Sequence, residues 1–194
     1  MLFQSIYKNV KTLNYSINCF SYNDKPITTL YMLMSVDGKE PPSKSPVSFV
    51  IMDNHHLSQA GVRYFTAWAK DFVLITNNKF HPAFDVDEDN LHIIYQEEQN
   101  LRSVLVQLKS EYGCDLLTVQ SGGTVNGLFL REKLFDYVDL VVAPVLIGGK
   151  DTSTLIDGCS LMSNDELSGL GVLKLEDCKV LEDSYLRLRY KVIS

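Results

Sequence analysis

Apolar and polar residues follow one another in short blocks that predict strands separated by helices. Almost continuously apolar runs indicate buried strands at residues 28–36, 47–53, 72–76, 91–96, 115–120 and 137–147. Towards the end of the chain the pattern changes to alternation, which predicts an antiparallel hairpin over residues 173–181 and 185–193. Between several of these strands the apolar spacing changes to that of a helix.

Three segments carry this helical spacing. Residues 58–70 place Val62, Phe65 and Ala69 on one face. The next helix has its apolar positions at i, i+3, i+4, i+7 and i+11, and it is followed by Gly113 as an expected C-cap; these positions are Leu101, Val104, Leu105, Leu108 and Tyr112. A third helix is expected over residues 124–134. Strands that alternate with helices predict an α/β protein with a mostly parallel sheet and an antiparallel end.

We expect one domain, because no internal repeat or second block of elements is visible. It spans residues 26–194, and residues 1–25 precede it as a variable or poorly ordered leader. The leader lacks the apolar block of a secretory signal. No apolar run approaches the length needed to cross a membrane.

Charge and cysteine content exclude several classes of function. The net charge of −6 argues against nucleic acid as a partner, since phosphate backbones need a basic surface. The four cysteines form no CxxC pair, which indicates a reducing compartment, and we expect a cytoplasmic protein. The histidines lack the spacing of metal ligands, so no metal site is expected.

The stretch QSGGT at residues 120–124 joins an expected strand directly to an expected helix. Ligands of open α/β sheets bind beyond the carboxyl ends of the strands. Gly122 and Gly123 carry no Cβ, and the helix that follows offers unpaired N–H groups and a partial positive charge. Thr124 adds a hydroxyl. This pattern is typical of a phosphate or pyrophosphate site, and it is equally compatible with a plain tight turn.

Two longer motifs resemble a known family. QSGGTVNGLFLREKLFDYVDLVVAPVLIGGKD at residues 120–151 and TTLYMLMSVDGK at residues 28–39 are similar to the reductase domain of riboflavin biosynthesis, of the dihydrofolate-reductase-like family. VSFVIMDN and FVLITNN match its middle strands more loosely. The resemblance covers most of residues 26–193 and implies a dihydrofolate-reductase-like fold.

The resemblance also implies an activity and a set of site residues. Such proteins use NADPH to reduce a ribosylamino-pyrimidine phosphate to its ribityl form, with the hydride going to the sugar C1′, and they often form homodimers. Asp37 would orient or protonate the substrate, and Gln120, where many members have glutamate, would face the substrate and the nicotinamide. The cofactor would be contacted by Leu33, Asn54, Thr76, Gly122, Gly123, Thr124, Val125, Asn126, Gly127 and Leu128. Lys79 is a candidate partner for a 2′-phosphate, although an ordinary surface lysine is the better explanation of it.

One segment departs from the family pattern. Members have several dozen residues, including a helix and a strand, between the Asp-Gly turn and the next strand, whereas this chain has only Glu40 to Pro46 there. The resemblance therefore implies an internal deletion that removes substrate contacts and part of the sheet. The alternative function is a catalytically impaired paralogue that acts as a nucleotide-binding or interaction protein.

Overall fold

The computed structural model describes residues 24–32, 47–98, 100–149, 152, 154–158, 163 and 170–193. Leu33, Asp37, the short 40–46 connection and most of the expected leader lie outside these residues. The last two leader residues belong to the folded domain: Arg102 Nη2 lies 3.2 Å from Asp24 Oδ2, and Lys25 Nζ lies 2.6 Å from Asp136 Oδ2.

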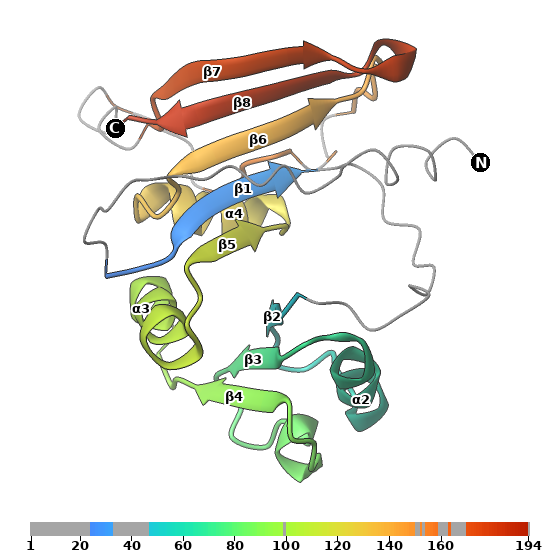
Figure 1. Cartoon of the computed structure of the whole chain (residues 1–194), viewed down its shortest axis with the longest axis vertical. Helices are drawn as coiled ribbons and strands as arrows, with labels where there is room; N and C mark the ends of the chain where they lie inside the picture. The colour runs from blue at the N-terminus through green and yellow to red at the C-terminus, as the bar shows by residue number, and fades with distance from the viewer. Residues whose placement is uncertain are drawn as a thin grey trace.

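The described chain is a mixed α/β domain, which confirms the expected fold class (Figure 1). Its strands are β1 (Ile27–Met32), β2 (Phe49–Met52), β3 (Phe72–Thr76), β4 (Leu91–Tyr95), β5 (Leu116–Val119), β6 (Tyr137–Val142), β7 (Leu173–Val180) and β8 (Leu186–Val192). Its helices are α2 (Gln59–Trp68), α3 (Leu101–Tyr112) and α4 (Gly123–Arg131). None of the described helices is long and apolar enough to cross a membrane.

The described strands form two sheets where the sequence predicted one. The larger sheet has the order β5-β1-β6-β8-β7, and the smaller has the order β2-β3-β4 (Figure 1). Strands β5, β1 and β6 run parallel, as do β2, β3 and β4, while β8 pairs antiparallel with β6 and β7. The parallel body and the antiparallel end are therefore confirmed. The prediction of a single continuous sheet is not confirmed, because β2 and β5 each hydrogen-bond to only one described strand.

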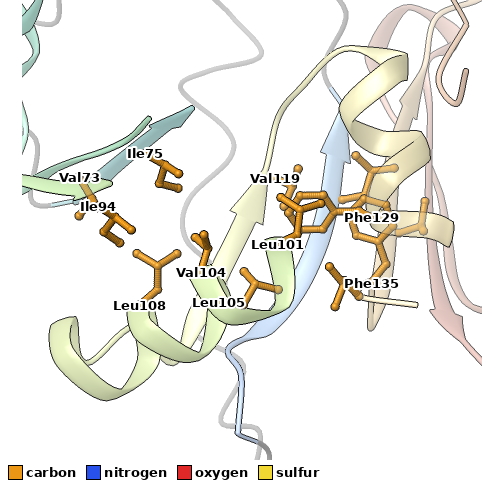
Figure 2. Close-up of a cluster of buried hydrophobic side chains, with 13 residues drawn as sticks. Val73, Ile75, Ile94, Leu101, Val104, Leu105, Leu108, Val119, Phe129 and Phe135 are labelled. Carbon is orange, nitrogen blue, oxygen red and sulfur yellow. The ribbon is translucent and has the colours of Figure 1, made fainter. Parts of the chain in front are cut away.

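Helix α3 holds the two sheets together. Leu101 lies near Phe129 and Phe135 beside the larger sheet, and Leu108 points towards Val73 and Ile94 in the smaller one (Figure 2). The helix begins at a capping asparagine, since Asn100 Oδ1 accepts a 2.9 Å bond from the N–H of Ser103. It ends at Gly113, whose φ of 64° confirms the expected left-handed C-cap.

Helix α2 packs on the other face of the smaller sheet and forms a second core. Val62 and Ala69 are fully buried against Phe72 and Leu74, which confirms the expected apolar face. Ser58 begins the helix, because its Oγ accepts a 3.2 Å bond from the N–H of Gly61.

Two predicted elements end earlier than the apolar pattern suggested. Strand β6 stops at Val142 and not at Ile147, because Pro144 has no N–H to give to a neighbouring strand. Helix α4 stops at Arg131 and not at residue 134, because Lys133 takes the left-handed conformation with φ 54°. The N–H of Leu134 then bonds to the carbonyl of Phe129, which closes the helix end.

Candidate functional site

The junction of β5 and α4 leaves the first turn of the helix open. Gly122 is the N-cap and supplies no side-chain hydrogen bond. The N–H groups of Gly123, Thr124 and Val125 have no acceptor within the described part of the chain, whereas the N–H of Asn126 bonds to the carbonyl of Gly122 at 3.1 Å. Gly122 and Thr124 are exposed. The positive end of the helix dipole therefore faces a place that an anion can reach.

The glycines of this loop serve different purposes. A Cβ on Gly123 would lie 2.3 Å from Asp157 Oδ2, and one on Gly127 would lie 2.2 Å from the carbonyl oxygen of Asp157. Both glycines are therefore required by the packing of residues 154–157 against α4. A Cβ on Gly122 would have no neighbour within 4 Å. Of the glycine pair, only Gly122 leaves open space for a ligand.

The side chain of Asn126 hydrogen-bonds to residues on both sides of the loop. It is fully buried, and its Nδ2 donates to the carbonyls of Ser121 at 3.2 Å and Leu155 at 2.9 Å. Its Oδ1 accepts a 2.5 Å bond from Ser121 Oγ. With these bonds made, its side chain positions the turn and does not face solvent. Leu128, one turn further along, is exposed.

The carboxyl end of β5 borders a hollow of about 270 Å³ between the two sheets. Gln120, which is exposed, lines this hollow together with Ser121 and Val125. Met52 and Ile75, from the carboxyl ends of β2 and β3, line it from the other side. The structure thus brings the 120–125 loop towards the ends of β2 and β3.

Asn54 and Thr76 lie just beyond those strand ends and order the next loop. Asn54 Oδ1 accepts bonds from the N–H of Asn77 at 2.9 Å and from Thr76 Oγ1 at 3.3 Å. The N–H of Asn78 donates to Thr76 Oγ1 at 3.1 Å. Thr76 is fully buried, so its role visible here is to shape the loop. Lys79, on the same loop, lies 3.6 Å from Glu97 Oε1.

Sequence reasoning missed a buried Asp–His cluster beside this loop. Asp53 accepts a 2.9 Å bond from His81 Nε2, and it also accepts bonds from the backbone N–H groups of His56 and Leu57. His81 is 1% exposed, and its Nδ1 accepts from the N–H of Ala83, so the ring is the neutral tautomer with its proton on Nε2. Both ring nitrogens are therefore occupied, and the pair is structural. An aspartate directly after an apolar strand was the available signal.

The environment of Asp53 favours its charged form. Burial raises the pKa of this carboxyl, but the hydrogen bonds from His81, from the N–H groups of Leu57 and His56, and from the His56 ring outweigh burial and hold the pKa well below its usual range. A depressed folded-state pKa means that the native state binds fewer protons than the unfolded state. The stability contributed by Asp53 is therefore present above its unfolded pKa of about 3.9 and is lost as the pH falls below it.

We expect Asp53→Asn to remove the part of the folding stability that depends on the ionised Asp53 carboxylate. The free energy of unfolding of the variant should lie below that of the unaltered chain at pH 7, and the difference should shrink as the pH falls from 4 to 2. Urea unfolding of both proteins across this pH range measures the difference in their free energies of unfolding. Asp87→Asn, at an exposed acid outside the cluster, is the matched control and should show no such convergence. A difference that stays constant across the range would contradict the assignment.

Comparison with known proteins identifies the family. The model of the RibD C-terminal domain matches residues 33–184. A 69-residue stretch is 30% identical to the 2,5-diamino-6-ribosylamino-4(3H)-pyrimidinone 5′-phosphate reductase of Archaeoglobus fulgidus, and covers 36% of this chain and 32% of that protein. A 46-residue stretch is 39% identical to the reductase of the same name from Methanothermobacter thermautotrophicus, and covers 24% of this chain and 21% of that protein. The chain thus matches a third or less of the length of these relatives.

Solved structures share the fold at low sequence identity. The riboflavin biosynthesis reductase of Saccharomyces cerevisiae superposes with a TM-score of 0.58 at 12% identity, over 100% of this chain and 99% of that one. A second similar structure is that of the diaminohydroxyphosphoribosylaminopyrimidine deaminase/5-amino-6-(5-phosphoribosylamino)uracil reductase of Thermotoga maritima. It superposes with a TM-score of 0.59 at 18% identity, over 88% of this chain and 46% of that one. The resemblance and the dihydrofolate-reductase-like fold expected from the two sequence motifs are confirmed, and this chain belongs to the RibD C-terminal domain family.

Proposed function

We propose that this chain is an NADPH-dependent reductase of riboflavin biosynthesis that reduces a ribosylamino-pyrimidine phosphate at the sugar C1′. Membership of the RibD C-terminal domain family supports a reductase, and two relatives carry the name of this reductase. The observation that carries the proposal is the open first turn of α4. There, N–H groups with no acceptor among the described residues lie next to Gly122, where an added Cβ would meet no atom within 4 Å.

The residues at this turn fit the diphosphate of a dinucleotide. The N–H groups of Gly123, Thr124 and Val125 would donate to its oxygens, and the Thr124 hydroxyl would add a further donor. Asp157 places a carboxylate beside Gly123, so the diphosphate would sit on the Gly122 side. NADPH would supply the hydride, and the chain would position the two reactants.

The remaining site residues follow from the resemblance. Gln120, exposed at the edge of the hollow, would contact the substrate and the nicotinamide, and Asn54 and Thr76 would support the adenosine side. Leu33 and Asp37, which lie outside the described residues, keep their proposed roles as a main-chain cofactor contact and as the residue that orients or protonates the substrate. We propose that the enzyme is a cytoplasmic homodimer.

Calorimetric titration with NADPH tests the diphosphate site, and Gly122 is the residue to change. Gly122→Asp should weaken NADPH binding about tenfold or more. The new carboxylate would accept hydrogen bonds from the N–H groups of the first turn, and its charge would repel the diphosphate. The same change should not reduce stability, since aspartate is a favoured N-cap and no neighbour lies within 4 Å of its Cβ position.

Gly122→Ala is the matched control, since it adds a Cβ without a charge and should bind NADPH within about threefold of the unaltered chain. Substitution at Gly123 would not serve, because its Cβ would collide with Asp157. Equal NADPH affinity in the aspartate and alanine variants would place the diphosphate elsewhere.

The alternative, a catalytically silent nucleotide-binding protein, is favoured by a different observation. No described strand joins β2 to β5, and the connection from β1 to β2 is shorter than the family pattern implies. Turnover of the ribosylamino-pyrimidine phosphate, followed by NADPH absorbance, separates the two functions. NADPH binding at the Gly122 side without turnover would establish the alternative.

A further inference from the structure

A carboxylate lies beside the first turn of α4 without capping it. A Cβ on Gly123, the first residue of the helix, would come within 2.5 Å of Asp157 Cγ. Among the described residues the partner of this carboxylate is Thr154, whose Oγ1 donates to Asp157 Oδ1 at 2.5 Å. The N–H groups of Gly123, Thr124 and Val125 keep no acceptor within the same part of the chain. A negative charge is therefore next to the helix end, and the donors there stay available to a ligand.

The segment that carries Asp157 is fixed to α4 at several points. The N–H of Asp157 donates to the carbonyl of Gly123 at 3.0 Å, and Asn126 Nδ2 donates to the carbonyl of Leu155 at 2.9 Å. The carbonyl of Asp157 lies against Gly127, where a Cβ would not fit. The backbone of Asp157 cannot turn away without breaking these contacts, so its charge is held in place before a ligand arrives.

The fixed charge of Asp157 acts on any anion that binds the same helical turn. The first turn of α4 attracts anions through its N–H groups and the helix dipole, whereas Asp157 repels them. One turn of an α-helix rises about 5 Å, which is less than the Debye length of about 8 Å at physiological salt, so the two charges interact. Asp157 is half-buried, and water therefore screens part of the repulsion.

We propose that Asp157 limits the affinity of this chain for the diphosphate of its dinucleotide and so favours release of the oxidised cofactor. The inference rests on the proposed function, because it requires a diphosphate at the first turn of α4. A reductase must exchange the oxidised dinucleotide for the reduced one in every cycle. Both forms carry the same diphosphate, so the repulsion weakens their binding to the same degree and shortens the time for which each stays bound.

Asp157→Asn tests the proposal, because asparagine has nearly the same shape and its Oδ1 still accepts the bond from Thr154 Oγ1. In calorimetric titrations at low salt, the variant should bind NADPH about three- to tenfold more tightly than the unaltered chain. NADH carries the same diphosphate and should gain affinity by the same factor. Stopped-flow displacement should show dissociation of NADPH slowed by about twofold or more.

Opposite changes in affinity and stability distinguish this role from a merely structural one. A negative charge near the N-terminus of a helix stabilises it, so Asp157→Asn should slightly lower the urea midpoint of unfolding while it tightens NADPH binding. If Asp157 only ordered its segment, stability and affinity would fall together. Salt gives a second readout: the two dissociation constants should converge in 1 M NaCl, where the Debye length is about 3 Å.

Glu132→Gln is the matched control. Glu132 is exposed and is the C-cap of the same helix, so the change removes one negative charge from the opposite end of α4. The helix has 9 residues and is therefore about 13 Å long, which exceeds the Debye length at physiological salt. The NADPH affinity of this variant should stay within about twofold of that of the unaltered chain.

Comparison with Gly122→Asp separates a failure of this inference from a failure of the proposed function. Weaker NADPH binding in Gly122→Asp, together with unchanged or weaker binding in Asp157→Asn, would keep the diphosphate site and overturn the role of Asp157. No effect of either change would place the diphosphate elsewhere and overturn both. A gain in affinity that persists undiminished in 1 M NaCl would mean that Asp157 acts through packing, and it would also overturn the proposal.

Discussion

Gly127→Ala is expected to lower the free energy of unfolding by about 2 kcal/mol, although alanine is the better helix former by about 1 kcal/mol. The new Cβ would lie 2.2 Å from the carbonyl oxygen of Asp157 and 3.2 Å from its carbonyl carbon. These are backbone atoms, so no side-chain rotation relieves the overlap. Residues 154–157 would have to move off α4, which would stretch the 3.0 Å bond from the N–H of Asp157 to the carbonyl of Gly123. Chemical denaturation measures the change.

Gly122→Ala provides the control for this experiment. Residue 122 has φ −75°, which alanine adopts without strain, and its Cβ would point into open space. The expected loss is below about 1 kcal/mol, the usual cost of alanine at an N-cap. If Gly127→Ala were as stable as the unaltered chain, the close packing of residues 154–157 on α4 would be wrong.

Asp139→Asn is expected to cost about 2–3 kcal/mol of stability, because it removes the charge that compensates two arginines. Asp139 is 2% exposed within β6, and it accepts bonds from Arg187 Nε at 2.9 Å and Arg187 Nη2 at 2.7 Å. Arg189 Nη1 lies 3.7 Å from the same carboxylate. The two arginine side chains are 24% and 23% exposed, so water compensates part of the loss and the expected cost falls below that of a fully buried pair.

Glu176→Gln is the matched control, since Glu176 Oε2 lies 3.8 Å from Arg189 Nε and its side chain is 38% exposed. A surface ion pair of this kind contributes between about 0 and 1 kcal/mol. Urea unfolding of both variants at neutral pH gives the comparison. Equal stabilities of the Asp139 and Glu176 variants would show that the buried carboxylate does not hold β8 against β6.

The elements that sequence reasoning predicted well are those determined by neighbours in the chain. The apolar spacing of α3 and its terminal Gly113 depend on residues within a few turns, and so does the buried run of β3. The division into two sheets depends on which strand edges meet, and no local pattern encodes that. The same limit applies to Asp53 and His81, which are 28 residues apart and meet only in the fold.

The candidate site shows the same contrast. The position of the glycine pair between β5 and α4 was predictable, because a strand, two glycines and a helix follow one another directly. The sequence did not predict that Gly123 is needed for packing whereas Gly122 borders open space. Gly123 and Gly127 are required by residues 154–157, which come about thirty residues later and carry no signal that they return to α4.

The position of β1 in the larger sheet has a consequence for synthesis on the ribosome. β1 pairs with β5 and β6, so Ile27 meets Leu116 and Thr29 meets Tyr137, while β2, β3 and β4 are successive neighbours along the chain. The small sheet and α2 are therefore complete once residue 95 has emerged, but β1 still has neither partner. Throughout that interval β1 lacks both of its neighbours in the sheet, which lengthens the time for which its edges are open to pairing with other chains.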